Sequence, residues 1–228
     1  MVPLCVRSNY SLMWGVDGVR TICRAAVRMG YDRLALTDTD NLYGLWTFLS
    51  ACRREGIQPI VGAELTDPHS KRRVVCLVES AEGYGNLCRI LTRRHLSVDF
   101  TIKEAVLAHA RGLCFLVTDP GLMKAWHAAG VWVAAHMPRR PLLGSHPLCR
   151  MAYHLKVPLV ATPSSFFLSS EDVSIHRLLR AIDMNTTLTR LKDGDAAPAD
   201  AWLASPETYA ARFAICPEAI QATRKIAA

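Results

Sequence analysis

The sequence lacks both the long apolar runs of a membrane protein and the low hydrophobicity of a disordered one. Of its 228 residues, 50% are hydrophobic and 21% are charged, which is enough apolar material for one sizeable core. No apolar run approaches the roughly 20 residues that a membrane helix needs, and the start of the chain lacks the order of a secretory signal. These absences predict a cytoplasmic protein without a membrane segment.

The sequence also has no Cys-x-x-Cys pair, although it contains eight cysteines. Most of these cysteines lie inside apolar runs, which favours buried free thiols over a disulfide scaffold. A zinc site built from thiolate ligands is therefore not expected.

Positive charge is in excess but is not concentrated. The net charge is +7, with 15 basic and 11 acidic groups in residues 1–114, and 12 and 9 in residues 115–228. Short basic clusters such as residues 71–73 and 93–95 have no aromatic side chains interleaved with them, as a base-stacking platform would require. We expect at most weak, non-specific and largely electrostatic binding to DNA.

Short apolar runs alternate with helical patterns along most of the chain. Seven runs are predicted as strands, nearly all apolar on both faces, as in a parallel sheet covered by helices. The sequence has no G-x-G-x-x-G after its first run, so a closed or nearly closed α/β barrel is favoured over a doubly wound sheet. The expected strands are residues 3–6, 34–37, 59–64, 74–78, 113–117, 131–135 and 157–161.

Helical patterns fill most of the intervals between these runs. Residues 185–204 instead form a Gly-, Asp-, Ala- and Pro-rich loop. We therefore expect residues 1–184 to form the barrel, and residues 185–228, a loop and C-terminal helices, to complete the domain. The expected helices are residues 17–30, 41–56, 81–96, 101–111 and 141–156, one after Pro120, and two that begin at Ser205 and Pro217.

Polar side chains follow the predicted strands at their carboxyl ends, where functional groups of a parallel α/β barrel project. Four of them are carboxylates, which could hold a hard cation such as magnesium or manganese. Residues 38–41 could instead cap the helix that follows. The polar residues at these ends are Cys5, Arg7, Asp38, Thr39, Asp40, Asn41, Glu64, Asp119, His136, Ser164 and Ser165.

Six separated motifs resemble those of one known family. Residues 3–15 (PLCVRSNYSLMWG) resemble the opening of the polymerase and histidinol phosphatase (PHP) domain, which usually reads P-L-H-x-H-S-x-Y-S-L followed by glycine. Residues 36–44 (LTDTDNLYG) resemble its T-D-H-x-N-L-Y-G motif, and residues 59–64 (PIVGAE) are similar to its third motif. The resemblance implies a distorted, seven-stranded TIM-like barrel. Residues 83–91 and 160–172 resemble segments of this domain as it occurs at the amino terminus of bacterial DNA polymerase III alpha subunits, and residues 216–227 resemble the boundary that precedes the polymerase palm.

The resemblance also implies a metal site that this sequence does not retain. In active members, histidines and acidic partners hold divalent metals that polarise a phosphoester and generate hydroxide. At five of the family's motif positions the residues differ here, namely Cys5, Arg7, Thr39, Ser164 and Phe166. No catalytic residue is therefore assigned.

Three weak candidates for a metal ligand remain, namely Asp38, Glu64 and His95. Arg7 places a permanent positive charge where cations would bind. No metal or other cofactor is therefore expected. The alternative is that these three residues still form a residual site, which would then hold manganese, zinc or magnesium. We expect the Arg7 guanidinium to pair with Asp38 or Glu64 instead.

The resemblance implies a catalytically degenerate PHP domain of the DNA polymerase III alpha type, without the palm, fingers and thumb. Such a domain would be a structural or docking module in DNA replication or repair, with polymerase or proofreading exonuclease subunits as partners. A metal-dependent phosphoesterase or 3′–5′ exonuclease of the family, and a non-specific nucleic-acid binding module, stay open as alternatives. Cys5 as a nucleophile activated by Arg7, with His136 as base, is less favoured because the first strand offers no histidine.

Overall fold

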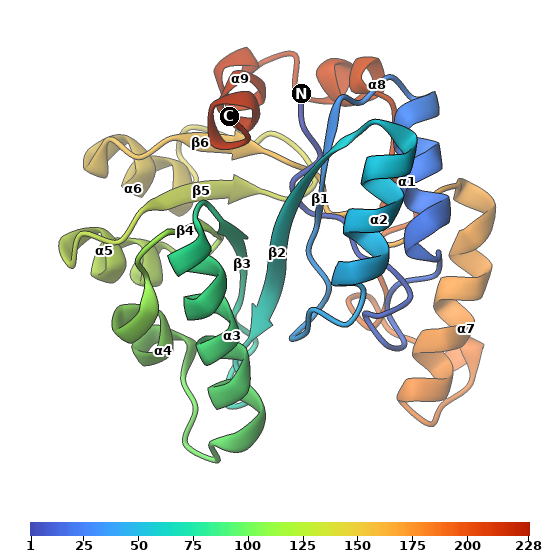
Figure 1. Ribbon diagram of the computed structural model, residues 1–228, viewed down its shortest axis with the longest axis horizontal. Helices are drawn as coiled ribbons and strands as arrows, with labels where there is room; N and C mark the ends of the chain where they lie inside the picture. Colours follow the sequence, from blue (N-terminus) through green and yellow to red (C-terminus); the bar gives the residue numbers. More distant parts are fainter.

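A curled sheet of six strands forms the centre of the computed structural model, which describes residues 1–228 (Figure 1). These are six of the seven predicted strands, and their bounds differ from the prediction by at most two residues. Strands that are neighbours in the sheet are also consecutive along the chain. They are β1 (Arg33–Leu36), β2 (Gln58–Thr66), β3 (Arg73–Val78), β4 (Leu113–Val117), β5 (Val133–Met137) and β6 (Leu159–Ala161).

The sheet is mixed, which corrects the prediction of a parallel one. β3 runs antiparallel to both β2 and β4, whereas the β1–β2, β4–β5 and β5–β6 pairs are parallel. Residues 67–72, which join β2 to β3, are too few for a helical crossover, so the two strands form a hairpin. The hairpin places Arg73 at the edge of the sheet where β2 ends.

The predicted first strand is an extended segment rather than a regular strand, so a seventh strand is not observed. It makes one β-bridge, between Val6 and Ser165. The amide of Thr37 donates to the Val6 carbonyl (2.8 Å), and on the opposite side the amide of Ser165 donates to the Cys5 carbonyl (2.9 Å). The amide of Leu4 donates to a side-chain hydroxyl instead of a backbone carbonyl, which interrupts the ladder.

Most of the helices pack around the outside of the curled sheet (Figure 1). Most predicted helices are confirmed, and α3 has the predicted bounds, whereas α7 was not predicted. They are α1 (Val19–Arg28), α2 (Leu45–Glu55), α3 (Ala81–Leu96), α4 (Ile102–His109), α5 (Pro120–Ala128), α6 (Pro147–Leu155), α7 (Val173–Asp183), α8 (Pro206–Arg212) and α9 (Pro217–Ile226), with 3₁₀ turns η1 (Ser170–Asp172) and η2 (Leu188–Arg190). None of them combines the length and the hydropathy that crossing a membrane requires.

The strands divide their side chains between the two faces of the sheet, and the outer face contributes to two separate apolar cores. In β4, Phe115 belongs to the large core formed with α3 to α6, whereas Cys114 and Leu116 belong to a smaller core inside the curl. This alternation follows from the two-residue period of a strand. Ala222 of α9 joins the inner core. All eight cysteines are free thiols, as predicted, and six of them are buried.

Candidate functional site

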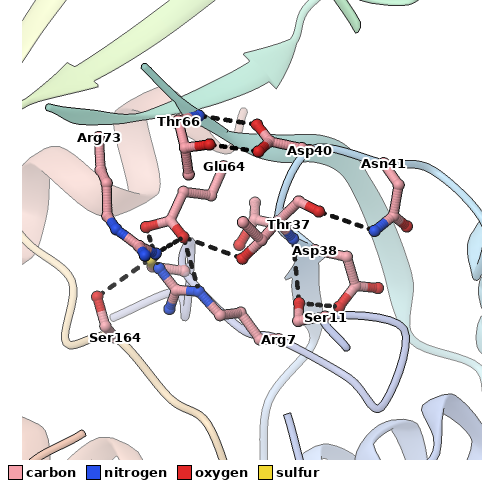
Figure 2. A network of polar contacts seen from close by, with 12 residues as sticks. Arg7, Ser11, Thr37, Asp38, Asp40, Asn41, Glu64, Thr66, Arg73 and Ser164 are labelled. Carbon is pink, nitrogen blue, oxygen red and sulfur yellow. Dashed lines mark hydrogen bonds and ion pairs between the residues drawn. The ribbon is translucent and has the colours of Figure 1, made fainter. Parts of the chain in front are cut away.

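Polar side chains meet where β1 and β2 end, as predicted for Cys5, Arg7, Asp38, Glu64 and Ser164. Cys5 and Arg7 come from the extended amino-terminal segment, Asp38 follows β1, and Glu64 lies in β2. Figure 2 shows that Arg7 and Glu64 point toward each other. The carboxyl ends of neighbouring strands therefore assemble one polar cluster.

Arg7 and Glu64 form a buried ion pair at the centre of this cluster. Arg7 Nε donates to Glu64 Oε2 (3.2 Å) and Arg7 Nη2 donates to Oε1, and the two side chains are only 3% and 5% exposed. Arg73 Nη1 and Thr39 Oγ1 donate to the same Oε2, at 2.8 Å and 3.0 Å. Glu64 is thus bound by two guanidiniums and one hydroxyl.

The pair is charged in spite of its burial. Desolvation favours the neutral form of Glu64, but the guanidiniums of Arg7 and Arg73 outweigh it and hold the pKa of that carboxyl below its ordinary value. Desolvation would likewise lower the pKa of Arg7, yet the Glu64 carboxylate raises it. Each partner therefore keeps the other ionised.

Asp38 is held by the loop that follows the amino-terminal segment, not by Arg7. Its oxygens accept hydrogen bonds from the Ser8 amide (2.7 Å), the Ser8 hydroxyl (2.8 Å) and the Ser11 hydroxyl (2.7 Å). Burial raises the pKa of Asp38, and these hydrogen bonds oppose that shift. The loop requires Gly15, because a Cβ there would lie 1.8 Å from the Ser8 carbonyl oxygen. Of the two pairings expected for Arg7, only the one with Glu64 forms.

His95 lies apart from this cluster. Its Nε2 contacts the backbone carbonyl of Asp40 at 2.7 Å, and the Asp40 carboxylate pairs with Arg94 at 3.3 Å. Asp38, Glu64 and His95 therefore have separate partners, and no group of three or more His, Cys, Asp and Glu side chains is placed to hold a metal ion. The donor set does not fit the metal cluster that the resemblance implies. Metal content itself stays a prediction.

Cys5 and Ser164 are adjacent, with 3.3 Å between Sγ and Oγ. Burial raises the pKa of the Cys5 thiol in spite of Arg7, which disfavours the thiolate that a nucleophile needs. His136, in β5, is also buried, which lowers its pKa to about 4. Its Nε2 donates to the carbonyl of Thr162 (2.8 Å), as expected of a neutral interior histidine.

Aromatic rings complete the cluster. The guanidinium carbon of Arg7 lies 4.2 Å from the ring centroid of Phe166, and that of Arg73 lies 4.9 Å from the ring of Trp14. The Trp14 ring also contacts Arg180, at 3.8 Å. Neither Arg73 nor Trp14 was predicted from the sequence to belong to the site. The basic run before β3 was the available signal for Arg73, but a parallel sheet would have placed it at the opposite edge.

A large open cavity adjoins the ion pair. Its volume is about 1290 Å³, and Arg7, Glu64, His136, Ser164 and Phe166 form part of its wall. The site is therefore accessible from one side, although its central ion pair is buried.

Comparisons with known proteins agree with the sequence motifs. The family model of the PHP domain matches residues 4–136. DNA polymerase III subunit alpha of Neisseria meningitidis serogroup A / serotype 4A is 26% identical over 262 residues, which cover 99% of this chain and 23% of that protein. Error-prone DNA polymerase of Pseudomonas aeruginosa is 30% identical over 174 residues, which cover 68% of this chain and 16% of that protein. The chain spans less than a quarter of the length of these relatives.

One solved structure is similar in fold at low sequence identity. It is a two-domain protein from Bacteroides vulgatus that contains a predicted PHP-like metal-dependent phosphoesterase. The TM-score is 0.54 with 12% identity, over 72% of this chain and 51% of that chain. This likeness concerns the fold alone.

Proposed function

This chain belongs to the PHP domain family, and from that premise we propose that it is a catalytically degenerate PHP domain of the DNA polymerase III alpha type. The buried Arg7–Glu64 pair carries the proposal. A guanidinium is bound to the carboxylate that would otherwise be available to a metal, and it repels a dication. The proposed remnant site comprises Cys5, Arg7, Asp38, Thr39, Glu64, Ser164 and Phe166, whereas His95 lies apart from it.

The proposed role is structural or docking. Glu64 of β2 binds Arg7 of the amino-terminal segment and Arg73 of β3. One carboxylate therefore connects three segments at the edge of the sheet where β2 ends. In this proposal the guanidiniums replace metal ions as the positive charge that holds these segments together. Residues 1–184 form a distorted TIM-like barrel in this account, and residues 185–228 complete the same domain.

The relatives suggest the context in which such a module acts. Their names are those of a replicative polymerase subunit and an error-prone polymerase. The proposed partners are accordingly polymerase or proofreading exonuclease subunits in DNA replication or repair, in the bacterial cytoplasm. Contact of this chain with DNA would be weak and non-specific.

Turnover distinguishes this proposal from a phosphoesterase or exonuclease. We expect the wild-type protein to hydrolyse neither p-nitrophenyl phosphate nor the 3′ end of a DNA strand, with manganese, zinc or magnesium present. Arg7→His should raise manganese affinity, since it removes the permanent charge, yet turnover should also require histidine at positions 5 and 39 and the Asp and His pair at positions 164 and 166. Wild-type turnover that chelation and Glu64→Gln both abolish would show an active enzyme.

A further inference from the structure

The cavity beside the ion pair carries an excess of positive charge. Eight Arg and Lys side chains and four Asp and Glu side chains line it, a formal excess of four positive charges. Three of the four carboxylates, Glu64, Asp119 and Asp200, are paired with arginines, and Asp193 is exposed to solvent. Basic residues of the wall that have no carboxylate partner are Lys71, Arg177, Lys192 and Arg212.

One donor of Arg7, which is a residue of this wall, has no acceptor. Arg7 uses Nε and Nη2 to bind Glu64, but its Nη1 is buried and makes no hydrogen bond. In Figure 2 no dashed line reaches this nitrogen. An unpaired donor on a charged, buried group is costly, so an acceptor that completes the guanidinium would be stabilising.

An oxyanion is the kind of ligand that suits both the unpaired donor of Arg7 and the positive charge of the cavity wall. Its oxygens supply acceptors for Nη1, and its charge offsets the excess of positive charge in the wall. Arg73, whose side chain is 41% exposed, and the half-buried hydroxyl of Ser164 lie next to Arg7 and have further donors to offer. A water molecule would complete Nη1 but would leave the positive charge uncompensated.

The aromatic residues favour recognition of a phosphate group over recognition of a base. The ring of Trp14 contacts the guanidiniums of Arg73 and Arg180, and the ring of Phe166 contacts that of Arg7. These contacts compete with the stacking on which base recognition depends.

We infer that this cavity is a metal-independent binding site for a phosphate group, with Arg7 Nη1 as its innermost donor and Arg73 and Ser164 beside it. The phosphate belongs either to a small phosphate or to the end of a nucleic-acid strand, since both offer the same oxygens. The site has the opposite polarity to a metal centre, because the protein supplies the positive charge and the ligand the negative charge.

Calorimetric titration with inorganic phosphate in the presence of a chelator tests the inference. We expect saturable binding of one phosphate per chain. Arg7→Lys should weaken it by about tenfold or more, because lysine keeps the charge beside Glu64 but removes the planar set of donors. Arg54→Gln, which removes an exposed charge on α2 away from the cavity, should change the affinity by less than about twofold.

Two oligonucleotides of one sequence, with and without a 5′-phosphate, identify the source of the phosphate. Tighter binding of the phosphorylated strand, lost in Arg7→Lys, assigns the site to strand ends. Equal binding of both strands, together with Arg7-dependent binding of inorganic phosphate, assigns it to a small phosphate.

A second variant keeps the test decisive if Arg7→Lys does not fold. Arg73→Gln changes a partly exposed side chain and should weaken phosphate binding by more than Arg54→Gln does. Non-saturable binding of phosphate, or equal affinities in the wild type and in Arg7→Lys or Arg73→Gln, would overturn the inference. Because a chelator is present throughout, this result is independent of whether the protein hydrolyses phosphoesters.

Discussion

At the scale of single residues, the site is organised around Glu64. One guanidinium would already balance the charge of this buried carboxylate. Glu64 nevertheless binds two guanidiniums, those of Arg7 and Arg73, as well as the hydroxyl of Thr39. Removing either member of a buried pair leaves the other charge without compensation, and this is the main energetic consequence of such a pair.

Arg7→Met should therefore destabilise the protein by about 3–5 kcal/mol, because Glu64 would keep only the partly exposed Arg73 as a cationic partner. The double variant Arg7→Met/Glu64→Gln should recover part of that loss. Urea denaturation measures both free energies of unfolding, with Arg54→Met as the surface control. A loss below about 1 kcal/mol in Arg7→Met would be that of a surface pair and would contradict the account.

His136 should make stability depend on pH. Its pKa is about 4 in the folded protein against an ordinary 6.5, so the unfolded chain takes up the proton first as pH falls. The free energy of unfolding should therefore decrease between about pH 6.5 and pH 4, by about 2 kcal/mol from pH 7 to pH 5. His136→Gln keeps a donor for the Thr162 carbonyl and should remove this contribution.

Denaturation of the wild type and of His136→Gln across this pH range checks the prediction. His127→Gln, at an exposed position in α5, is the matched control and should retain the wild-type dependence. Identical pH profiles for the wild type and His136→Gln would show that His136 titrates normally.

At the scale of elements, regular patterns were predicted, whereas the reversal of direction at β3 was not. The sequence predicted α3 and β4, and it predicted that Arg7 would pair with Asp38 or Glu64, because apolar runs, caps and the positions of strand ends are local signals. Of these two pairings, only the one with Glu64 forms. The sequence did not predict that β3 runs antiparallel, since an apolar run has no direction. The short connection at residues 67–72 was the signal for the hairpin.

The helix α7 was missed for a different reason. Its apolar residues Ile175, Leu178 and Ile182 have helical spacing, but they are 48%, 49% and 57% exposed, whereas His176 and Arg180 of the same helix are buried. The helix faces the protein with polar side chains, and His176 bonds to the backbone of the amino-terminal loop. A pattern that assumes an apolar buried face cannot indicate this packing.

Two glycines of α3 should respond in opposite ways to alanine. A Cβ at Gly83 would lie 1.8 Å from the Gly112 carbonyl oxygen, so Gly83→Ala must displace backbone and should cost about 1–3 kcal/mol or more. A Cβ at Gly85 would meet only the end of the Arg89 side chain, at 3.5 Å. Gly85→Ala should therefore stabilise the protein by about 0.5–1 kcal/mol.

Thermal and urea denaturation of the two α3 variants measure the difference. Because both substitutions add the same methyl group to the same helix, each is the control for the other. Destabilisation of similar size in both variants would mean that the close approach of α3 to the residues before β4 is not as described.

At the scale of the whole molecule, the fold brings the permanent cation of Arg7 against Glu64, and in our proposal this is the place where active members of the family would bind metal ions. Arg7, Glu64 and Arg73 come from three separate parts of the chain and meet only because the amino-terminal segment, β2 and β3 end at one edge of the sheet. The shared architecture is therefore compatible with a changed chemistry at its centre.

The manganese content of the protein is the most direct test of whether guanidiniums have replaced metal ions at Glu64. The purified wild-type protein, saturated with manganese and then freed of excess metal, is analysed for bound manganese by mass spectrometry. The account predicts far less than one manganese per chain, because Arg7 and Arg73 bind the carboxylate of Glu64 and the other candidate ligands have separate partners. One or more tightly held manganese ions per chain, lost in Glu64→Gln, would contradict it.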